Sequence, residues 1–188
     1  MERIVDKIIN LDVNEIKNFD FPFDELFGIE VLIDGINYEF IARFSSFSDG
    51  LICFGSGSAD RNGPKAVEPP IFQRFSWYNA FEESVLFYND PTRYLGDLRL
   101  GWGIGDRDIW YLGVIADIIV LISENIGVKS KNTLFYGSSG GGFTSIQLGT
   151  LIKGSLVLIN NSQLILFNYE SKLDYFEKVL KTCFGVWI

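Results

Sequence analysis

The stretch of sequence that decides the fold reads Leu134-Phe135-Tyr136-Gly137-Ser138-Ser139-Gly140-Gly141-Gly142-Phe143. It places an apolar run of strand type directly before a glycine-rich run that can open a helix. Between the two, Gly137, Ser139 and Gly141 match the pattern G-x-S-x-G. A serine in such a turn adopts a strained backbone conformation, so the residues two before and two after it must be small. The pattern predicts a nucleophile elbow with Ser139 at its tip.

The elbow also predicts where an anionic reaction intermediate would be stabilised. A helix that starts at Gly140 directs its free N–H groups and its positive dipole end at the serine, so the N–H of Gly140 is the first expected oxyanion donor. A second donor normally comes from the loop after the third strand, which here is Gly55-Ser56-Gly57-Ser58. We expect Gly55 or Ser56 to supply it.

A glycine-rich turn between strand and helix has other uses. It can simply make a tight connection, or it can bind a phosphate at the helix N-terminus. No Lys-Ser or Lys-Thr follows at the spacing of a P-loop, and the loop that begins at Gly55 lacks the third glycine of a dinucleotide fingerprint. We therefore expect no cofactor, whereas the tight connection stays open as an alternative.

The elements around the elbow alternate between strands and helices. Residues 28–33 and 38–44 are two β-rich runs joined by Asp34-Gly35, which is typical of an antiparallel hairpin. Further strands are expected at 51–54, 84–88, 133–136 and 155–159, and helices at 108–125 with Asp108 as the cap, at 140–151 and at 169–182. This order predicts an α/β fold of three layers (helix, sheet, helix), with a mostly parallel sheet and the antiparallel hairpin at one edge.

The chain has the length of one ordinary domain. We expect a charged lead-in segment over residues 1–27 and one α/β domain over residues 28–188. The apolar end at 184–188 looks like the start of another strand. We therefore expect the domain to be incomplete at its C-terminus.

Composition excludes several classes of protein. Sixteen Lys and Arg against 24 Asp and Glu give a formal net charge of -8, which is not the basic footprint of a nucleic-acid-binding protein. Residues 1–10 lack the basic n-region and the continuous apolar h-region of a signal peptide, so we expect no secretion. The most apolar window, 109–122, is shorter than the roughly 20 residues of a membrane span. Cys53 and Cys183 make neither a disulfide framework nor a zinc spacing, so we expect no metal and a cytoplasmic location.

Polar residues that follow the predicted strands are candidates for substrate binding. Asp90 would lie at the carboxyl edge of the sheet, where open α/β sheets bind ligands, although Asp before Pro more often caps a turn. Asn160, Asn161 and Gln163 would emerge at the same edge and bind sugar hydroxyls, or simply form the turn.

A long loop region carries Arg61, Arg74 and Trp77 among three prolines. It would form either a lid, with an anion-binding arginine and a sugar-stacking indole, or a surface excursion around a buried tryptophan.

The chain contains no histidine. A serine hydroxyl is a poor nucleophile without a neighbouring base, and in a fold with this elbow the base is a histidine that follows the serine in chain order. Three explanations stay open: a histidine beyond Ile188, a pseudoenzyme, or a substituting carboxylate or lysine.

Together with the elbow, three short motifs resemble the α/β-hydrolase-like XcbB/CpsF family of capsular polysaccharide biosynthesis proteins. The motifs are Asn89-Asp90-Pro91-Thr92, Gly101-Trp102 and Ile159-Asn160-Asn161-Ser162-Gln163, and the resemblance runs from about Leu51 to Gln163. That family is expected to have proline and threonine where this chain has Ser162 and Leu164. The resemblance implies a bacterial cytoplasmic protein of cell-surface polysaccharide assembly.

Two functional hypotheses follow. The first is a serine hydrolase or acyltransferase-like protein with Ser139 as nucleophile, inactive or nearly so in this form, that acts on a small-molecule, lipid or saccharide substrate. The second is a non-catalytic module that binds a saccharide or a protein on the same fold. The oligomeric state is not predicted.

Overall fold

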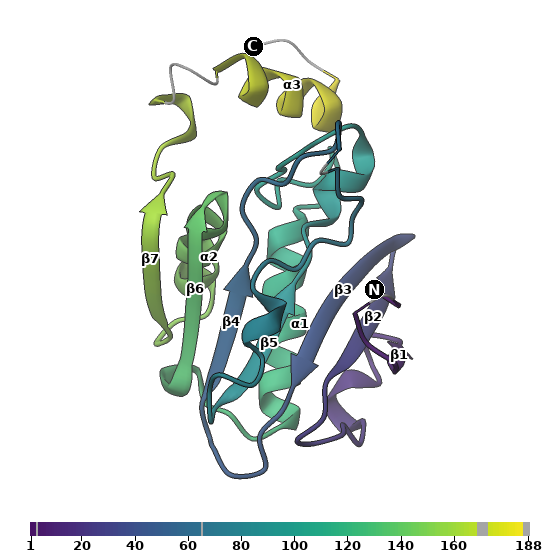
Figure 1. Cartoon of the computed structure of the whole chain (residues 1–188), viewed down its shortest axis with the longest axis vertical. Helices are drawn as coiled ribbons and strands as arrows, with labels where there is room; N and C mark the ends of the chain where they lie inside the picture. The colour runs from purple at the N-terminus through teal and green to yellow at the C-terminus, as the bar shows by residue number, and fades with distance from the viewer. Residues whose placement is uncertain (3, 65, 169–172, 186–188) are drawn as a thin grey trace.

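A computed structural model describes residues 1–2, 4–64, 66–168 and 173–185. Within this part of the chain, seven strands form one sheet with the order β1-β2-β3-β5-β4-β6-β7 (Figure 1). The strands are β1 (Ile8–Leu11), β2 (Phe27–Ile33), β3 (Ile36–Arg43), β4 (Leu51–Gly55), β5 (Ser84–Tyr88), β6 (Thr133–Ser139) and β7 (Leu156–Ser162). The α-helices are α1 (Tyr111–Asn125), α2 (Gly140–Leu151) and α3 (Leu173–Phe184). Short 3₁₀ helices span Ile16–Asn18, Phe75–Trp77, Pro91–Leu95, Ser130–Asn132 and Leu166–Asn168.

The sheet is mostly parallel, as the order of elements predicts. β3 runs antiparallel to both of its neighbours, β2 and β5, whereas β5, β4, β6 and β7 pair in parallel. β4 and β6 are neighbours although β5 and α1 lie between them in sequence, and Gly55 is paired with Gly137. The loop after β4 therefore emerges beside the elbow at the end of β6.

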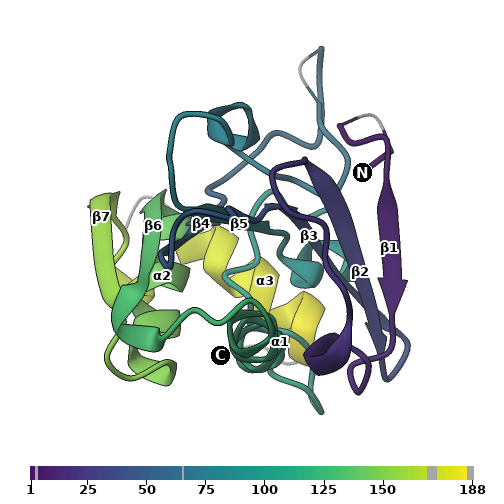
Figure 2. The same cartoon turned by 90° about the horizontal axis from the view of Figure 1, so that it is seen from below.

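The two faces of the sheet are covered differently. α1 and α2 lie on one face, where α1 packs on a core that includes Phe40, Phe135 and Leu148 (Figure 2). α3 lies beyond the ends of the strands and packs on the segment that carries Leu98, Leu100 and Trp102 (Figure 1). The other face is covered by the segment that follows β4, whose Phe72 and Phe81 pack on Phe54 and neighbouring strands. The third layer is thus an irregular segment with one short 3₁₀ helix.

The first 27 residues contribute to the sheet. β1 pairs in parallel with β2, and Ile9, Leu11, Ile16 and Phe21 are buried in the main core. Sequence did not predict β1, because four strand residues flanked by Asp and Lys give too short a pattern.

Helix α1 starts later than expected, so the prediction that Asp108 is its N-cap is wrong. Trp110 is the N-cap, and the carboxylate of Asp106 accepts hydrogen bonds from the N–H groups of Asp108 and Ile109 at 2.9 Å. The chain is still in this turn at residue 108, which delays the helix. The predicted end is confirmed, because α1 stops at Asn125 and Gly127 follows with φ 74°.

At the C-terminal end, the predicted helix is present as α3, which extends through Phe184. Phe184 therefore does not begin a strand. The rest of that predicted strand, 186–188, lies outside the described residues, and so does the predicted start of the helix at 169–172. None of the described helices combines the length and the apolar character that crossing a membrane requires.

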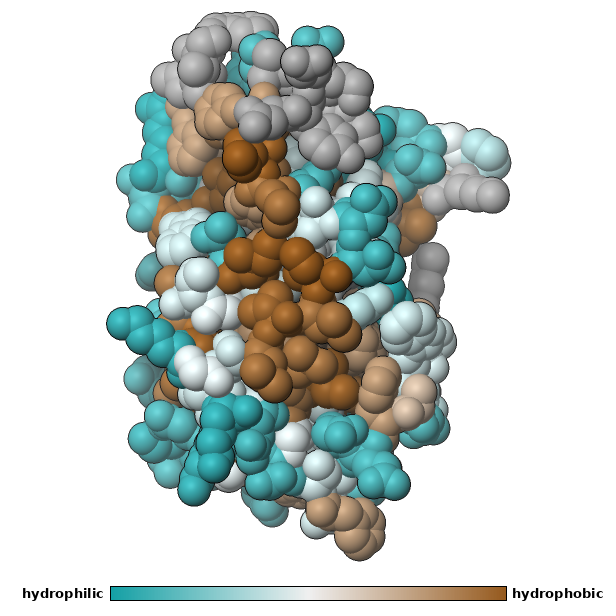
Figure 3. Space-filling model, turned by 90° about the vertical axis from the view of Figure 1, so that its left-hand side faces the viewer, coloured by the Kyte–Doolittle hydropathy of each residue, from teal (hydrophilic) through white to brown (hydrophobic). Residues whose placement is uncertain are grey.

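The β7 edge of the sheet is exposed and apolar. Leu156 is 61% exposed and Leu158 is 54% exposed. The side of the molecule on which β7 lies in Figure 1 shows a hydrophobic area in Figure 3. The sequence from Gly154 to Asn168 contains no charged residue. This edge therefore lacks the charges that usually prevent a strand from pairing with another chain.

Candidate active site

Ser139 occupies the turn that the sequence pattern predicts. It is the last residue of β6 and the N-cap of α2, with φ 53° and ψ -125°. A non-glycine residue in this region of backbone space costs about 1–3 kcal/mol, and such residues gather at functional sites. The strand and the helix on either side hold Ser139 in this conformation at the carboxyl edge of the sheet.

Glycine is required on both sides of the elbow because three backbone segments meet there. A Cβ atom on Gly137 would collide with the carbonyl group of Gly141, and a Cβ atom on Gly141 would collide with the carbonyl oxygen of Gly55. β4, β6 and the first turn of α2 are therefore in direct backbone contact.

The expected oxyanion donors lie next to this contact. Gly140 is the first residue of α2, and the Gly55–Ser56 peptide lies against Gly141. The hydroxyl of Ser56 donates to the carbonyl of Ile71 and accepts from the N–H of Gln73, both at 2.9 Å. These bonds fix the loop after β4 beside the elbow.

The loop after β4 also reaches the serine itself. A Cβ atom on Gly57 would lie 3.7 Å from the Cβ of Ser139, although the Gly57 N–H donates to Oε1 of Gln73 at 2.9 Å. Gly57 is thus close to Ser139 but has its donor occupied.

Ser139 borders a small, largely apolar pocket. Trp102 and Gln163 form one wall, joined by a 2.6 Å hydrogen bond from the indole Nε1 to Oε1 of Gln163. The N–H of Gln163 also donates to the carbonyl of Ser139 at 3.2 Å. α3 supplies Tyr175 and Phe176 as a further wall. Ser58, Arg99, Leu100 and Leu166 complete the lining.

The four predicted substrate-binding residues occupy three different environments. Gln163 lines the pocket and is buried, whereas Asn160 and Asn161 are exposed at the end of β7 and do not line it. Asp90 is buried beneath the pocket wall, where one carboxylate oxygen accepts from the Thr92 N–H and the other from the Gly101 N–H, each at 3.1 Å.

Asp90 therefore holds the loop that carries Leu100 and Trp102. Burial raises the pKa of the Asp90 carboxyl above its ordinary value, and hydrogen bonds from Thr92 and Gly103 counteract part of this effect.

The three residues of the predicted lid do not all make the same contacts. Arg74 lies beside the elbow, where its guanidinium donates to the hydroxyl of Ser138 at 2.6 Å and stacks over Trp77 and Tyr136. Arg61 instead forms an ion pair with Glu68 at 2.8 Å and does not line the pocket of Ser139. Trp77 is 42% exposed, so it is not a buried tryptophan.

Sequence reasoning missed most of the pocket wall. Trp102 has φ 55°, and its ring makes edge-to-face contacts with Tyr175 and Phe176 at 5.9 and 5.7 Å. The hydroxyl of Tyr175 donates to the Leu100 carbonyl at 2.7 Å and accepts from the Leu100 N–H at 2.9 Å. The signals in the sequence for this wall were Gln163 and the Gly101-Trp102 dipeptide, whereas nothing connected α3, which is far from Trp102 in sequence, with the pocket.

The described lining of the pocket contains Ser139 but no histidine or carboxylate that could act as its base. The chain as a whole has no imidazole. The arrangement can place a carbonyl group against Ser139, whereas removal of the hydroxyl proton requires a group that this lining does not contain.

The strand order, the elbow and the helices define an α/β-hydrolase-type fold. Comparison with solved structures agrees. The capsule O-acetyltransferase of Neisseria meningitidis serogroup A matches with a TM-score of 0.61 and 20% identity, over 80% of this chain and 61% of that chain. A histidine-to-alanine mutant of that enzyme in complex with CoA matches equally well, with a TM-score of 0.61.

A further match is the Glycosylation Associate Protein complex of Streptococcus agalactiae, with a TM-score of 0.52 and 20% identity over 72% of this chain and 24% of that chain. This chain spans 61% of the length of the O-acetyltransferase. No protein-family model matches the sequence, and no curated protein matches it. The similarity in structure is therefore a similarity of fold.

Proposed function

We propose that this chain belongs to a serine-dependent acyltransferase or hydrolase of capsular or cell-surface polysaccharide biosynthesis, with Ser139 as the nucleophile. The observation that carries the proposal is the backbone of Ser139, which has φ 53° at a strand-to-helix turn beside a pocket. The fold shared with a capsule O-acetyltransferase and the sequence resemblance to the XcbB/CpsF family support the polysaccharide context.

The geometry fits acyl transfer in two steps. The hydroxyl oxygen of Ser139 attacks the carbonyl carbon of an ester or thioester, and the resulting oxyanion accepts hydrogen bonds from the N–H of Gly140 and from the Gly55–Ser56 segment. The C–O or C–S bond to the leaving group then breaks, which leaves an acyl-serine. Attack by water or a sugar hydroxyl releases the serine. The proton of the serine must pass to a base in the first step.

Gln163 is the side chain proposed to contact the substrate inside the pocket. Asn160 and Asn161 are proposed to contact the outer part of a larger saccharide, because they are exposed at the same edge of the sheet. Asp90 is proposed to act as a positioning residue. The cytoplasm remains the proposed compartment, which the two free, buried cysteines support.

Labelling with a fluorophosphonate probe tests this function. We expect slow labelling that free imidazole accelerates, since exogenous imidazole can serve as the missing base, and we expect the Ser139→Ala variant to lose it. Ser138→Ala is the matched control, because Ser138 is the adjacent serine and must leave labelling intact. Labelling that does not depend on Ser139, with or without imidazole, would contradict the proposal.

The alternative is a non-catalytic module that binds a saccharide or a protein in the same pocket. The absence of histidine from the chain and of a carboxylate from the described pocket lining favours it. For such a module we expect saccharide binding in the wild type and in Ser139→Ala alike, together with no labelling of Ser139 in the presence of imidazole.

A further inference from the structure

The pocket beside Ser139 contains one charged side chain among its described lining residues, and it is Arg99. The other lining side chains are aromatic, aliphatic or neutral and polar. Arg99 is half-buried, so its charge is screened less than that of a fully exposed side chain and influences which ligands bind in the pocket. It also stands out in a chain whose formal net charge is -8.

Arg99 is held in place by an aromatic ring. Its guanidinium carbon lies 4.7 Å from the ring centroid of Tyr175, and the Tyr175 hydroxyl is anchored to the backbone of Leu100. Stacking of this kind occupies one face of the guanidinium and leaves its N–H edge available. Among the described residues, no carboxylate or carbonyl accepts a hydrogen bond from that edge.

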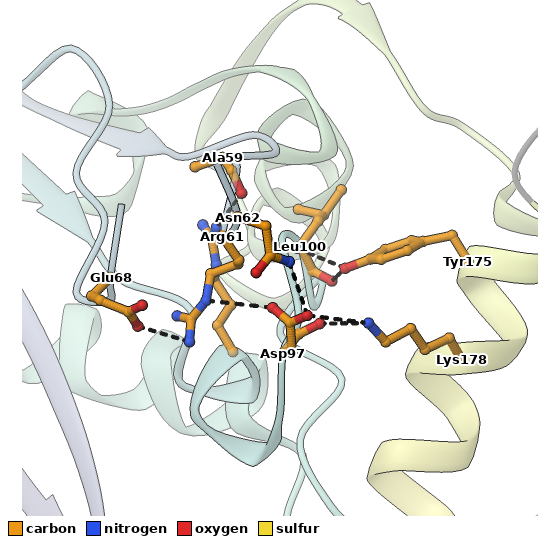
Figure 4. Close-up of polar contacts among 9 residues, drawn as sticks. Ala59, Arg61, Asn62, Glu68, Asp97, Leu100, Tyr175 and Lys178 are labelled. Carbon is orange, nitrogen blue, oxygen red and sulfur yellow. Dashed lines mark hydrogen bonds and ion pairs between the residues drawn. The ribbon is translucent and has the colours of Figure 1, made fainter. Parts of the chain in front are cut away.

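The neighbouring cations are already paired. Arg61 forms an ion pair with Glu68 at 2.8 Å, and Nζ of Lys178 lies 3.8 Å from a carboxylate oxygen of Asp97 and donates to its carbonyl at 2.7 Å (Figure 4). Arg61, Asp97 and Lys178 line a second hollow together with Asp60 and Asn62, and this hollow shares Arg99 and Tyr175 with the pocket of Ser139. Of the three cations that line these two hollows, Arg99 is therefore the one that forms no ion pair with a described residue.

We infer that Arg99 makes the Ser139 pocket selective for substrates that carry an oxyanion group, either a phosphate or a carboxylate, close to the group that reacts. A guanidinium edge binds such groups through two parallel charge-assisted hydrogen bonds. The inference rests on the proposed function for the identity of the reacting serine, and it identifies the class of substrate. The anion can be part of the acyl donor, as in CoA, or part of a phosphorylated or acidic sugar.

Equilibrium binding tests this inference without requiring catalysis. Phenyl phosphate and benzoate serve as anionic probes and benzyl alcohol as the neutral probe, each titrated by calorimetry or ligand-observed NMR into the whole chain. We expect Arg99→Gln to weaken binding of both anions about tenfold or more, and to change binding of benzyl alcohol less than twofold. Arg99→Lys, which keeps the charge but not the planar edge, is expected to fall between.

Two control variants distinguish a specific effect of Arg99 from a general loss of positive charge and from the role of Ser139. Lys131→Gln removes the same charge at the opposite end of the sheet, before β6, and must bind the anions like the wild type. Ser139→Ala must also retain anion binding, so the result stands whether or not Ser139 proves to be a nucleophile. Equal anion affinity in Arg99→Gln and the wild type, or equal losses in Arg99→Gln and Lys131→Gln, would overturn the inference.

A second set of ligands distinguishes the sources of the anion. CoA is compared with pantetheine, and glucose 1-phosphate with methyl glucoside. An Arg99-dependent preference for CoA over pantetheine assigns the anion to the acyl donor, and the corresponding preference for glucose 1-phosphate assigns it to the sugar. No Arg99-dependent preference in either pair overturns the inference.

Discussion

The indole Nε1 of Trp102 donates a 2.6 Å hydrogen bond to Oε1 of Gln163, and both side chains are buried. This bond joins the loop before α1 to the chain that leaves β7, two segments separated by 61 residues. Because the N–H of Gln163 also reaches the carbonyl of Ser139, the bond couples the pocket wall to the elbow.

Removal of either partner of this bond is expected to destabilise the protein. Gln163→Met leaves the indole N–H of Trp102 without its acceptor and costs about 1–3 kcal/mol of unfolding free energy. Trp102→Phe leaves the side-chain oxygen of Gln163 without its donor, so a similar loss of unfolding free energy is expected, together with a loss of packing from the smaller ring. In a urea-denaturation double-mutant cycle, the double variant should lose clearly less than the sum of the single losses. Strictly additive losses would show that the two side chains do not interact.

The backbone contact at the elbow makes Gly137 intolerant of any side chain. Gly137→Ala is expected to cost about 3 kcal/mol or more, because its methyl group meets the backbone of Gly141, which cannot move without displacing α2. Gly154→Ala is the control: it has open space around it, and its positive φ limits the cost to about 1 kcal/mol. Thermal and urea unfolding measure both, and equal losses would contradict the close contact.

Buried Glu39 gives the stability of the protein a dependence on pH. Burial raises its pKa above the ordinary 4.5, although hydrogen bonds from Tyr94 and Asn89 counteract this. The folded state therefore holds the proton more tightly than the unfolded state, so stability falls as pH rises from about 4.5 through the folded pKa.

Glu39→Gln should remove this part of the pH dependence, since the amide oxygen can still accept from Tyr94. Urea midpoints measured between pH 4 and pH 8 should therefore decline less with pH in the variant. The raised pKa of Asp90 also makes stability fall as pH rises, and this contribution is the same in the wild type and in Glu39→Gln. Parallel curves for the wild type and the variant would show that Glu39 does not titrate differently on folding.

The exposed edge strand predicts self-association. Leu156→Lys places a charge in β7 at a position whose native side chain is 61% exposed. The variant should therefore stay monomeric up to a higher protein concentration than the wild type. Its free energy of unfolding should change by only about 0.5 kcal/mol. Light scattering checks the first effect and urea unfolding the second. Leu148→Lys, at a fully buried position in α2, should instead prevent folding. Unchanged self-association in Leu156→Lys would rule out the β7 edge as its cause.

Much of the fold was predictable from local patterns, and most of the pocket was not. The elbow at Ser139 and the hairpin at Asp34-Gly35 depend on glycines at fixed short spacings, which sequence displays directly. The pocket wall depends on contacts between distant segments, such as Tyr175 with Leu100, which no local pattern reports. Asp108 failed as a helix cap because another carboxylate two residues earlier took the nearby N–H groups.

The position of α3 has a thermodynamic consequence. Tyr175 and Phe176 belong to the last described helix, yet they form a wall of the pocket that contains Ser139. Any ligand that contacts this wall binds only the state in which α3 is docked, so its binding free energy adds to the stability of the docked helix. Occupancy of the pocket should therefore be visible as slower amide hydrogen exchange along α3, which links substrate concentration to the order of the C-terminal segment.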